Sequence, residues 1–246
     1  MRYKLTIEYE GTNYSGWQKQ KNSSSIQENI EIAIEKFCGQ KLSIFGAGRT
    51  DAGVHASGQV AHVDFIEDRG VDQVLKGINF YLQNEKISVL EVEKVSQIFD
   101  ARFSAIMRHY RYKIINRKSP LTYDLNKCCH IRRPLNTALM QDAADLFIGE
   151  HDFTTFRSAN CQSKSPIKTI KSIFVKTLGE EIIIDFSARS FLHTQVRSIM
   201  GCILKAGTGS WDTNKVLNIL NAKNRDECAK LASASGLYLL KVDYDE

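Results

Sequence analysis

The chain is organised around the stretch GAGRTDAGVHASGQ, residues 46–59, which holds four glycines and a single carboxylate, Asp51. Residues 42–45 before it are typical of a short strand, and residues 59–65 after it alternate apolar with polar side chains. The stretch is therefore predicted to be a loop between two strands. Its glycines permit tight bends and the close approach of another backbone or of a ligand.

Two interpretations of Asp51 stay open on spacing alone. Arg49, two residues earlier, would keep a partly buried carboxylate ionised, and an ionised acid in a rigid pocket that excludes water is a nucleophile or a base. Alternatively, Asp51 hydrogen-bonds its own backbone in a turn and the glycines only satisfy turn geometry.

Composition places the chain among ordinary globular proteins. Its 246 residues, 43% hydrophobic and 25% charged, suit one large domain or two small ones, and we expect two. No apolar run approaches the length of a membrane span, and residues 1–9 read as a strand rather than a signal peptide, so a cytoplasmic location is predicted. The six cysteines have neither zinc-site spacing nor the density of a disulfide scaffold, and buried thiols are expected.

The net charge of +5 is unevenly distributed. Residues 102–133 contain nine Lys or Arg against one acid, Asp124, and residues 153–176 contain five against none. In residues 108–113 the basic side chains alternate with aromatic ones, a mixture that suits phosphates and stacked bases. A solvated charged face is the alternative for one such run, but two runs favour a polyanionic partner.

Periodicity predicts the same order of elements twice. The first half reads as a strand at 3–9, a helix begun by Ser25 and ended by Gly39, the two strands around the glycine stretch, a helix begun by Asp72, and a strand at 87–95.

The second half reads as a strand at 110–114, a helix begun by Asn136 that carries Leu139 and is ended by Gly149, strands at 169–177 and 182–188, a helix carrying Val196, Met200 and Ile203, two shorter helices, and a strand at 237–242. This order predicts an α+β protein of two ferredoxin-like (RRM-like) β-α-β-β-α-β halves, at residues 1–105 and 106–246, whose antiparallel sheets join side by side. The second domain would hold the basic strands.

Several blocks together carry a family resemblance. GRTDAGVH at 48–55, followed by GQV at 58–60, closely resembles the signature of the TruA-type tRNA pseudouridine synthases. Further blocks resemble that family in the same order: YSGWQKQ at 14–20, ARFSA at 101–105, RHYRY at 108–112, HDFTTF at 151–156 and GLYL at 236–239. The resemblance covers essentially the full length and implies the pseudouridine synthase fold.

The resemblance implies an isomerase that detaches uracil from its ribose in tRNA and rejoins it through C5. It implies no metal and no organic cofactor, and a homodimer that grips tRNA. The usual targets of the family are uridines at about positions 38 to 40 of the anticodon stem-loop, which must be flipped out of the stack to react.

Four residues match positions with roles at the active site of the family. Asp51 matches the catalytic aspartate, which attacks either ribose C1′ or uracil C6, and the sequence does not choose between them. Tyr110 matches a tyrosine that packs on the uracil and is the candidate base for the C5 proton; a cross-strand aromatic is the alternative. Arg197 matches an arginine paired with the aspartate; a solvated surface arginine is the alternative. Leu237 matches a residue that lines the base pocket; a core leucine is the alternative.

Other positions match RNA contacts of the family. Arg49, Arg102 and Phe103 match positions near the flipped nucleotide. A second RNA-contacting loop is predicted from its polar, basic character at Asn160, Cys161, Gln162, Ser163 and Lys164. A metal site joining Cys161 to Cys128, Cys129 and His130 is disfavoured, because adjacent cysteines rarely share a structural zinc. His55 and His62 are expected to be hydrogen-bonding residues of the loop and sheet.

The sequence departs from the family pattern near Phe80 and Gln83, at Ser233, and beside Arg197 at Thr194 and Ser198. These departures leave open a divergent paralogue that modifies another uridine or another RNA. Two further classes are carried as alternatives: a non-catalytic RNA-binding protein, and a metal-dependent hydrolase built on Asp51, His55 and Asp64.

Overall fold

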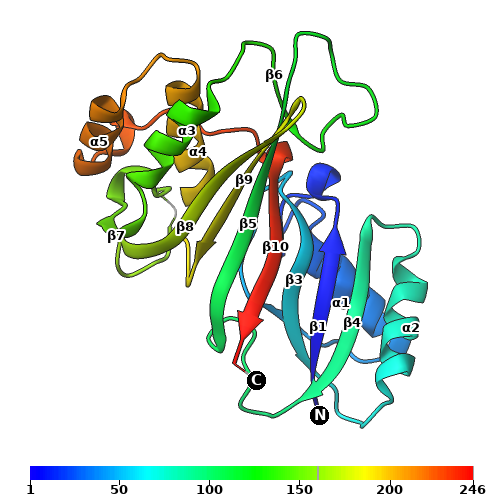
Figure 1. The fold of residues 1–246 in the computed structure, drawn as a ribbon. Helices are drawn as coiled ribbons and strands as arrows, with labels where there is room; N and C mark the ends of the chain where they lie inside the picture. The colour runs from blue at the N-terminus through cyan, green and yellow to red at the C-terminus, as the bar shows by residue number, and fades with distance from the viewer. Residues whose placement is uncertain (160, 246) are drawn as a thin grey trace. The chain divides into compact units, whose positions relative to one another are not determined.

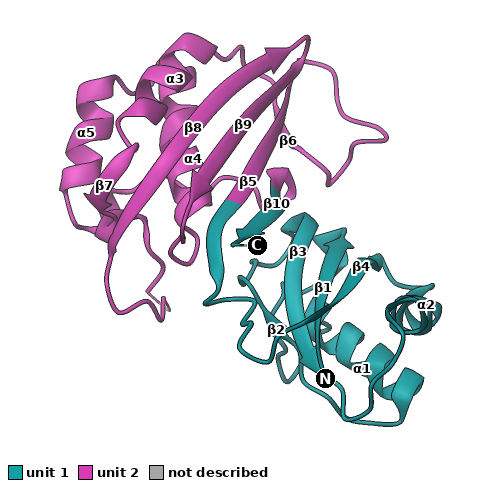
Figure 2. Cartoon of the chain, turned by 60° about the horizontal axis from the view of Figure 1, so that its bottom comes forward, with its two compact units in different colours: residues 1–108, 238–246 teal, residues 109–237 magenta. Residues whose placement is uncertain are grey.

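The computed structural model describes residues 1–159 and 161–245. The chain divides into two compact units, residues 1–108 with 238–246 and residues 109–237, which Figure 2 colours separately. The predicted domains, 1–105 and 106–246, assign the last strand to the second half, unlike these units, and they stay a prediction. In the described part of the chain, no helix has both the length and the apolar character needed to cross a bilayer.

Unit 1 is a sheet with two helices on one face (Figure 1), and its strands are antiparallel except for the pair of β3 and β10. Its strands pair in the order β4-β1-β3-β10, and β2 also pairs with β3. The elements are β1 (Arg2–Tyr9), α1 (Ile26–Cys38), β2 (Phe45–Gly46), β3 (His55–Asp64), α2 (Val71–Leu82), β4 (Ile87–Val95) and the C-terminal β10 (Leu237–Tyr244), which runs parallel to β3. Apart from β10, this is the predicted strand-helix-strand-strand-helix-strand order.

Local sequence signals account for most boundaries in unit 1. The Ser25 side chain accepts a hydrogen bond from the Glu28 N–H, and Gly39 ends α1 in the left-handed conformation at φ 73°, as predicted. The prediction that Asp72 begins α2 is wrong. Gly70 precedes the helix without a side-chain cap, and Asp72 lies inside the first turn, where its charge favours the helix dipole.

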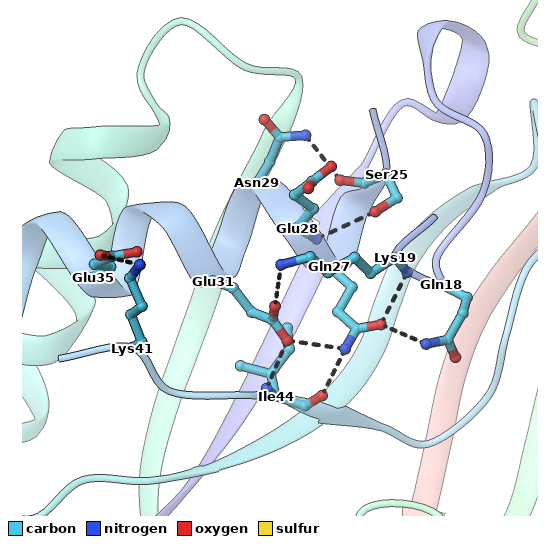
Figure 3. A network of polar contacts seen from close by, with 10 residues as sticks. All are labelled: Gln18, Lys19, Ser25, Gln27, Glu28, Asn29, Glu31, Glu35, Lys41 and Ile44. Atoms are coloured by element: carbon cyan, nitrogen blue, oxygen red, sulfur yellow. Dashed lines mark hydrogen bonds and ion pairs between the residues drawn. The ribbon is translucent and has the colours of Figure 1, made fainter. Parts of the chain in front are cut away.

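The predicted strand at 42–45 is mostly absent, and Figure 3 shows why. Side chains of α1 take the backbone hydrogen bonds that a strand would need: Ile44 N–H donates to Glu31 Oε1 at 3.2 Å, and Gln27 Nε2 donates to Ile44 O at 3.3 Å. Gln27 Oε1 also accepts from the Lys19 N–H at 3.1 Å. The helix thereby holds both the 16–20 segment and the approach to the glycine-rich stretch.

Unit 2 is a second sheet, in the order β5-β9-β8-β7 with β6 paired to β5. Its elements are β5 (Ala105–Asn116, whose first residues belong to unit 1), β6 (Cys129–Ile131), α3 (Thr137–Asp145), β7 (Gly149–Asp152), β8 (Ile167–Leu178), β9 (Glu181–Ala188), α4 (Gln195–Gly207) and α5 (Thr213–Asn221). In chain order, β5, α3, β8, β9, α4 and β10 repeat the pattern of the first half. The predicted α+β class is confirmed.

Two predictions for unit 2 need correction. Asn136 begins α3 as predicted, but Leu139 is 40% exposed, because α3 packs through Met140, Ala143 and Ala144 instead. Of the two short helices expected near the C-terminus, α5 is an α-helix, whereas residues 225–227 and 234–236 form short 3-10 helices.

Candidate active site

Asp51 lies in a loop, residues 47–54, that leads from β2 into β3 and is called the Asp51 loop below. Its neighbour Thr50 is buried and is held by two residues from the β1 side of the unit. Thr50 O accepts from the Trp17 N–H at 3.1 Å, and Thr50 Oγ1 shares a buried hydrogen bond of 2.8 Å with the Tyr9 hydroxyl. The backbone that carries Asp51 is therefore fixed from outside the loop.

A buried glutamine fixes the other side of the Asp51 loop. Gln59 is fully buried, its Nε2 donates to Gly48 O at 2.8 Å, and its Oε1 accepts from the Val60 N–H at 3.2 Å. Ala47 N–H donates to Val60 O at 2.7 Å. Because the nitrogen and the oxygen of this one buried amide are both hydrogen-bonded, Gln59 fixes the spacing between the loop and β3.

Two glycines outside the loop let the 11–16 segment pack against it. A Cβ on Gly16 would lie 2.4 Å from Thr50 O and 3.0 Å from the Asp51 carbonyl carbon, and the φ of Gly16 is +101°. A Cβ on Gly11 would lie 1.9 Å from Val54 O. The sequence reasoning considered the glycines of the loop and missed these two, although both lie in the turn-rich segment directly after β1.

Within this hydrogen-bonded loop Asp51 is half-buried, whereas Arg49 is exposed. Asp51 is thus partly exposed to solvent, while the backbone beside it is constrained. Val54 N–H closes a turn on Asp51 O at 3.1 Å, so the backbone at this residue forms a turn. The alternative, in which the Asp51 side chain hydrogen-bonds its own backbone, stays a prediction.

The metal-hydrolase alternative does not fit the structure. His55 is buried, its Nδ1 accepts from the Gly11 N–H at 3.1 Å, and its ring stacks on Tyr238 with centroids 4.6 Å apart. Asp64, at the opposite end of β3, is held by Arg2 in two hydrogen bonds of 2.8 and 2.7 Å. Among the residues described, no group of three His, Cys, Asp or Glu side chains is arranged to hold a metal ion.

The predicted RNA contacts Arg102 and Phe103 lie on a tight turn, residues 100–104, called the Arg102 turn below. The Asp100 carboxylate accepts from both of their N–H groups, at 2.8 and 2.9 Å. Both side chains point outward: Phe103 is 77% exposed, and the Arg102 guanidinium lies over its ring at 5.4 Å. An exposed aromatic ring beside a cation suits a stacked base.

Arg108 joins the Arg102 turn to the Asp51 loop. It is only 8% exposed, and its Nη2 donates to Ala47 O at 2.9 Å and to Arg102 O at 2.6 Å. The sequence reasoning counted Arg108 among basic residues available to phosphate. The structure turns it inward to backbone carbonyls, so it supports the site from behind.

Two further basic residues of β5 also form ion pairs within the fold. Arg111 makes a two-pronged ion pair with Asp185 on β9 at 2.7 and 2.9 Å, and Lys113 pairs with Glu181 at 3.3 Å. The strand therefore offers less available positive charge than its sequence suggests.

Tyr110 and Arg197 both belong to unit 2. Tyr110 lies on β5 with 9% of its surface exposed, and its ring meets Phe191 edge-on with centroids 5.3 Å apart. Arg197 lies in the first turns of α4 and is half-buried; its Nε donates to Ala232 O at 2.9 Å, and Ala232 N–H donates to Arg197 O at 3.1 Å.

The residue that precedes α4 has an unusual backbone. Thr194 has φ +65°, a conformation that β-branched residues rarely adopt. Gln195 is fully buried, and its Oε1 accepts from the Leu192 N–H at 2.7 Å, which fixes this turn. Backbone strain that the neighbouring residues hold in place is common at functional sites, and Thr194 lies three residues before Arg197.

The remaining predicted residues are placed as follows. Leu237 is buried like a core leucine. Of the predicted 160–164 loop, Asn160 lies outside the described residues, Gln162 and Lys164 are exposed, and Cys161 and Ser163 are half-buried. Arg157 Nη2 donates to Cys161 O at 3.1 Å and to Ser163 O at 3.5 Å, which shapes this loop from within. The structure joins the Asp51 loop and the Arg102 turn; the assembly of Asp51, Tyr110 and Arg197 into one site stays a prediction.

Comparison with known proteins identifies the class. A family model described as tRNA pseudouridine synthase matches residues 5–104 and 143–245, which include Asp51 and Arg197 and leave Tyr110 between the matched ranges. The chain is 50% identical to tRNA pseudouridine synthase A of Parvibaculum lavamentivorans and 51% identical to that of Bartonella tribocorum, each over 99% of both chains. The enzyme of the same name from Maricaulis maris is 47% identical over 99% of this chain and 98% of its own.

The chain therefore belongs to the tRNA pseudouridine synthase family. The resemblance and the fold predicted from the sequence blocks are confirmed.

Proposed function

We propose that this protein isomerises uridine to pseudouridine in tRNA, acting on the anticodon stem-loop at about positions 38 to 40 after base flipping. The family and the 50% identity to a tRNA pseudouridine synthase A support the reaction and the substrate class. The choice of uridine rests on the resemblance of the sequence blocks.

The observation that carries the catalytic assignment is the half-buried Asp51 on a backbone held from both sides. A nucleophile reacts efficiently when its position is set before the substrate arrives, because no reorganisation is then needed in the transition state. In this proposal the Asp51 carboxylate attacks ribose C1′ or uracil C6 of the flipped uridine and is released when the new bond to C5 has formed.

Tyr110 and Arg197 complete the proposed site. The Tyr110 ring, held edge-on against Phe191, packs on the uracil, and its phenol is the candidate acceptor of the C5 proton. Arg197 supplies a positive charge to the Asp51 carboxylate, and its two hydrogen bonds with Ala232 orient it. Leu237 walls the base pocket.

RNA binding is assigned to exposed groups. Arg102 and Phe103 form an outward cation and ring pair, and Gln162 and Lys164 are exposed on the second loop. A phosphate contact near the target nucleotide is assigned to Arg49, because it is exposed on the Asp51 loop. A homodimer and a cytoplasmic location complete the proposal. The homodimer rests on the resemblance alone, and light scattering of the purified chain measures it; the location rests on the composition and on the strand-like residues 1–9.

The experiment incubates the purified protein, without cofactor, with unmodified tRNA transcripts and maps pseudouridine by nucleotide. Asp51→Asn should reduce product formation by several orders of magnitude while tRNA affinity stays close to that of the wild type, because the amide keeps the shape and loses the nucleophile. Tyr110→Phe and Arg197→Met, in the same assay, should lower turnover more than affinity.

The matched control is Asp64→Asn, which removes a carboxylate of unit 1 that serves a structural ion pair with Arg2. It should retain turnover. Full activity of Asp51→Asn would overturn the catalytic assignment. Product at a uridine outside the anticodon arm would keep the chemistry and favour the divergent paralogue, and tRNA binding without any product would favour the non-catalytic alternative.

A further inference from the structure

Outside the proposed site, the segment of residues 225–232 packs across α4 and brings two cysteines together. Arg225 Nη1 donates to Ser198 Oγ on α4 at 2.8 Å and to Thr155 O at 3.2 Å. A Cβ on Gly201 would lie 2.3 Å from Lys230 O, so the helix and the segment are in direct backbone contact. Cys202 follows Gly201 on the helix, and Cys228 precedes Ala229, whose Cβ would lie 3.3 Å from a Cβ on Gly201. The two cysteine side chains share a hydrogen bond.

The two thiols differ in accessibility. Cys202 is fully buried, whereas Cys228 is half-buried. An oxidant from solvent therefore reaches Cys228 first, and Cys202 is the neighbour that can resolve the product.

The surroundings also favour a reactive thiolate at Cys228. Hydrogen bonding from Cys202 lowers the pKa of the Cys228 thiol, and the nearby Arg225 guanidinium and the Ser198 hydroxyl lower it further. The same shared hydrogen bond, together with burial, raises the pKa of Cys202. A thiolate beside an arginine and a second thiol has the features of a redox-active cysteine.

We propose that Cys202 and Cys228 form a reversible disulfide when the protein meets a peroxide. The Cys228 thiolate attacks one peroxide oxygen, the O–O bond breaks, and the departing hydroxide takes up a proton to become water, leaving a sulfenic acid. Cys202 sulfur then attacks that sulfur, the S–O bond breaks, and the second oxygen leaves as water with the Cys202 proton. The two thiols are oxidised by two electrons and the peroxide is reduced to two waters.

The disulfide would act on the proposed site through Arg197. Ala232, at the end of the same segment, exchanges two hydrogen bonds with Arg197. An S–S bond of about 2.05 Å is shorter than any thiol-thiol contact, so closure draws the 225–232 segment toward α4 and shifts Ala232. This consequence rests on the proposed function, whereas the disulfide itself does not.

The test treats the full chain with hydrogen peroxide, blocks free thiols in denaturant and maps peptides by mass spectrometry. A peptide pair joined through Cys202 and Cys228 and lighter by two hydrogens is expected, and it should disappear after dithiothreitol. Cys202→Ser should leave a sulfenic acid at Cys228 that a 1,3-dione traps. Cys161→Ser, which removes another half-buried cysteine of unit 2, should leave the joined pair unchanged.

Absence of the joined pair under conditions that oxidise Cys161 would overturn the proposal, as would an equal yield of a Cys202 disulfide in Cys228→Ser. In parallel, oxidised wild type should form pseudouridine about tenfold more slowly, reversibly, and Cys228→Ser should not respond. A disulfide that leaves turnover unchanged would overturn the link to Arg197. An inactive reduced wild type would count against the proposed function, and the peptide map would still decide on the disulfide.

Discussion

The Asp51 loop and the Arg102 turn, both in unit 1, hold their functional side chains in different ways. Beside Asp51, the backbone accepts hydrogen bonds from Trp17 at Thr50 O and from Gln59 at Gly48 O, and the Thr50 hydroxyl bonds to Tyr9. The Arg102 turn is held by Asp100, by Arg108 and at its base, where Ala101 is fully buried. The Ala101 N–H donates to His62 Nδ1 at 3.0 Å, and the Ala101 carbonyl accepts from the Tyr244 hydroxyl at 2.7 Å. The tip, with Phe103, is open to solvent.

The difference matches what each side chain is proposed to do. A nucleophile loses much of its rate when displaced by 1 Å or so, and it therefore needs support from several elements. A ring that stacks on a base tolerates small displacements, since stacking depends weakly on position in the plane. Variants that loosen the first region should thus act on turnover, and variants at the second on affinity.

The largest effect is expected from Gly16→Ala. Its Cβ would lie 2.4 Å from Thr50 O at a φ of +101°, so either the 11–16 segment or the Asp51 loop must move. The cost is roughly 3 kcal/mol in the free energy of unfolding. Turnover should fall further than that loss of stability explains, measured below the unfolding temperature. Urea denaturation and pseudouridine assays on the same preparation separate the two effects.

Gly39→Ala is the matched control, because Gly39 also has positive φ, +73°, but a Cβ there would meet nothing within 4 Å. It should cost about 1 kcal/mol and leave turnover unchanged. Equal losses of turnover in the two variants would mean that the close approach at Thr50 does not matter for the site.

Arg108→Gln should affect both regions at once. The guanidinium donates to Ala47 O and to Arg102 O, and its removal leaves buried carbonyl groups without a donor. We expect a loss of about 2 kcal/mol in the free energy of unfolding, together with lower turnover and weaker tRNA binding. Lys86→Gln, which removes a surface ion pair with Glu10, is the control and should change none of the three. Unchanged tRNA affinity in Arg108→Gln would contradict this prediction, because it would show that Arg108 does not support the Arg102 turn.

Prediction from sequence succeeded where the cause is local. The cap at Ser25, the helix end at Gly39 and the strand predicted at 3–9 depend on residues within one element, and the structure confirms each. The loop position of Asp51 follows in the same way, because the strand pattern after it is strong.

Prediction failed where partners far apart in the sequence decide the outcome. Nothing near Arg108 in the sequence indicates that it turns toward Ala47, and the role of Gly16 depends on how β1 and β3 pair. The surface of α3 that is buried, with Met140 inside and Leu139 outside, is set by packing on α4 and β8. Such contacts are properties of the assembled unit.

Phe103→Ala should weaken tRNA binding without destabilising the fold. The ring is 77% exposed, so its removal costs little burial, while loss of one base stack reduces affinity by about tenfold. Ile98→Ala is the control, because Ile98 is 89% exposed in the same unit and cannot stack. Binding is measured by filter retention at fixed salt and the unfolding midpoint by urea. A fall in stability for Phe103→Ala alone would show that the tip of the turn is structural.

The smallest effect is expected at the base of that turn, on acidification. Burial lowers the pKa of His62 below its ordinary value of 6.5, and the nearby Arg2 charge lowers it further. Only the neutral ring can accept the Ala101 N–H at Nδ1. As pH falls below 6.5, the unfolded chain binds the proton more readily than the folded one, so the free energy of unfolding decreases.

His62→Gln keeps an acceptor and removes this titration. Its urea midpoint should therefore depend less on pH between 6.5 and about 5 than that of the wild type. Parallel pH profiles would show that the base of the Arg102 turn does not respond to His62, leaving Arg108 as its main link to the Asp51 loop.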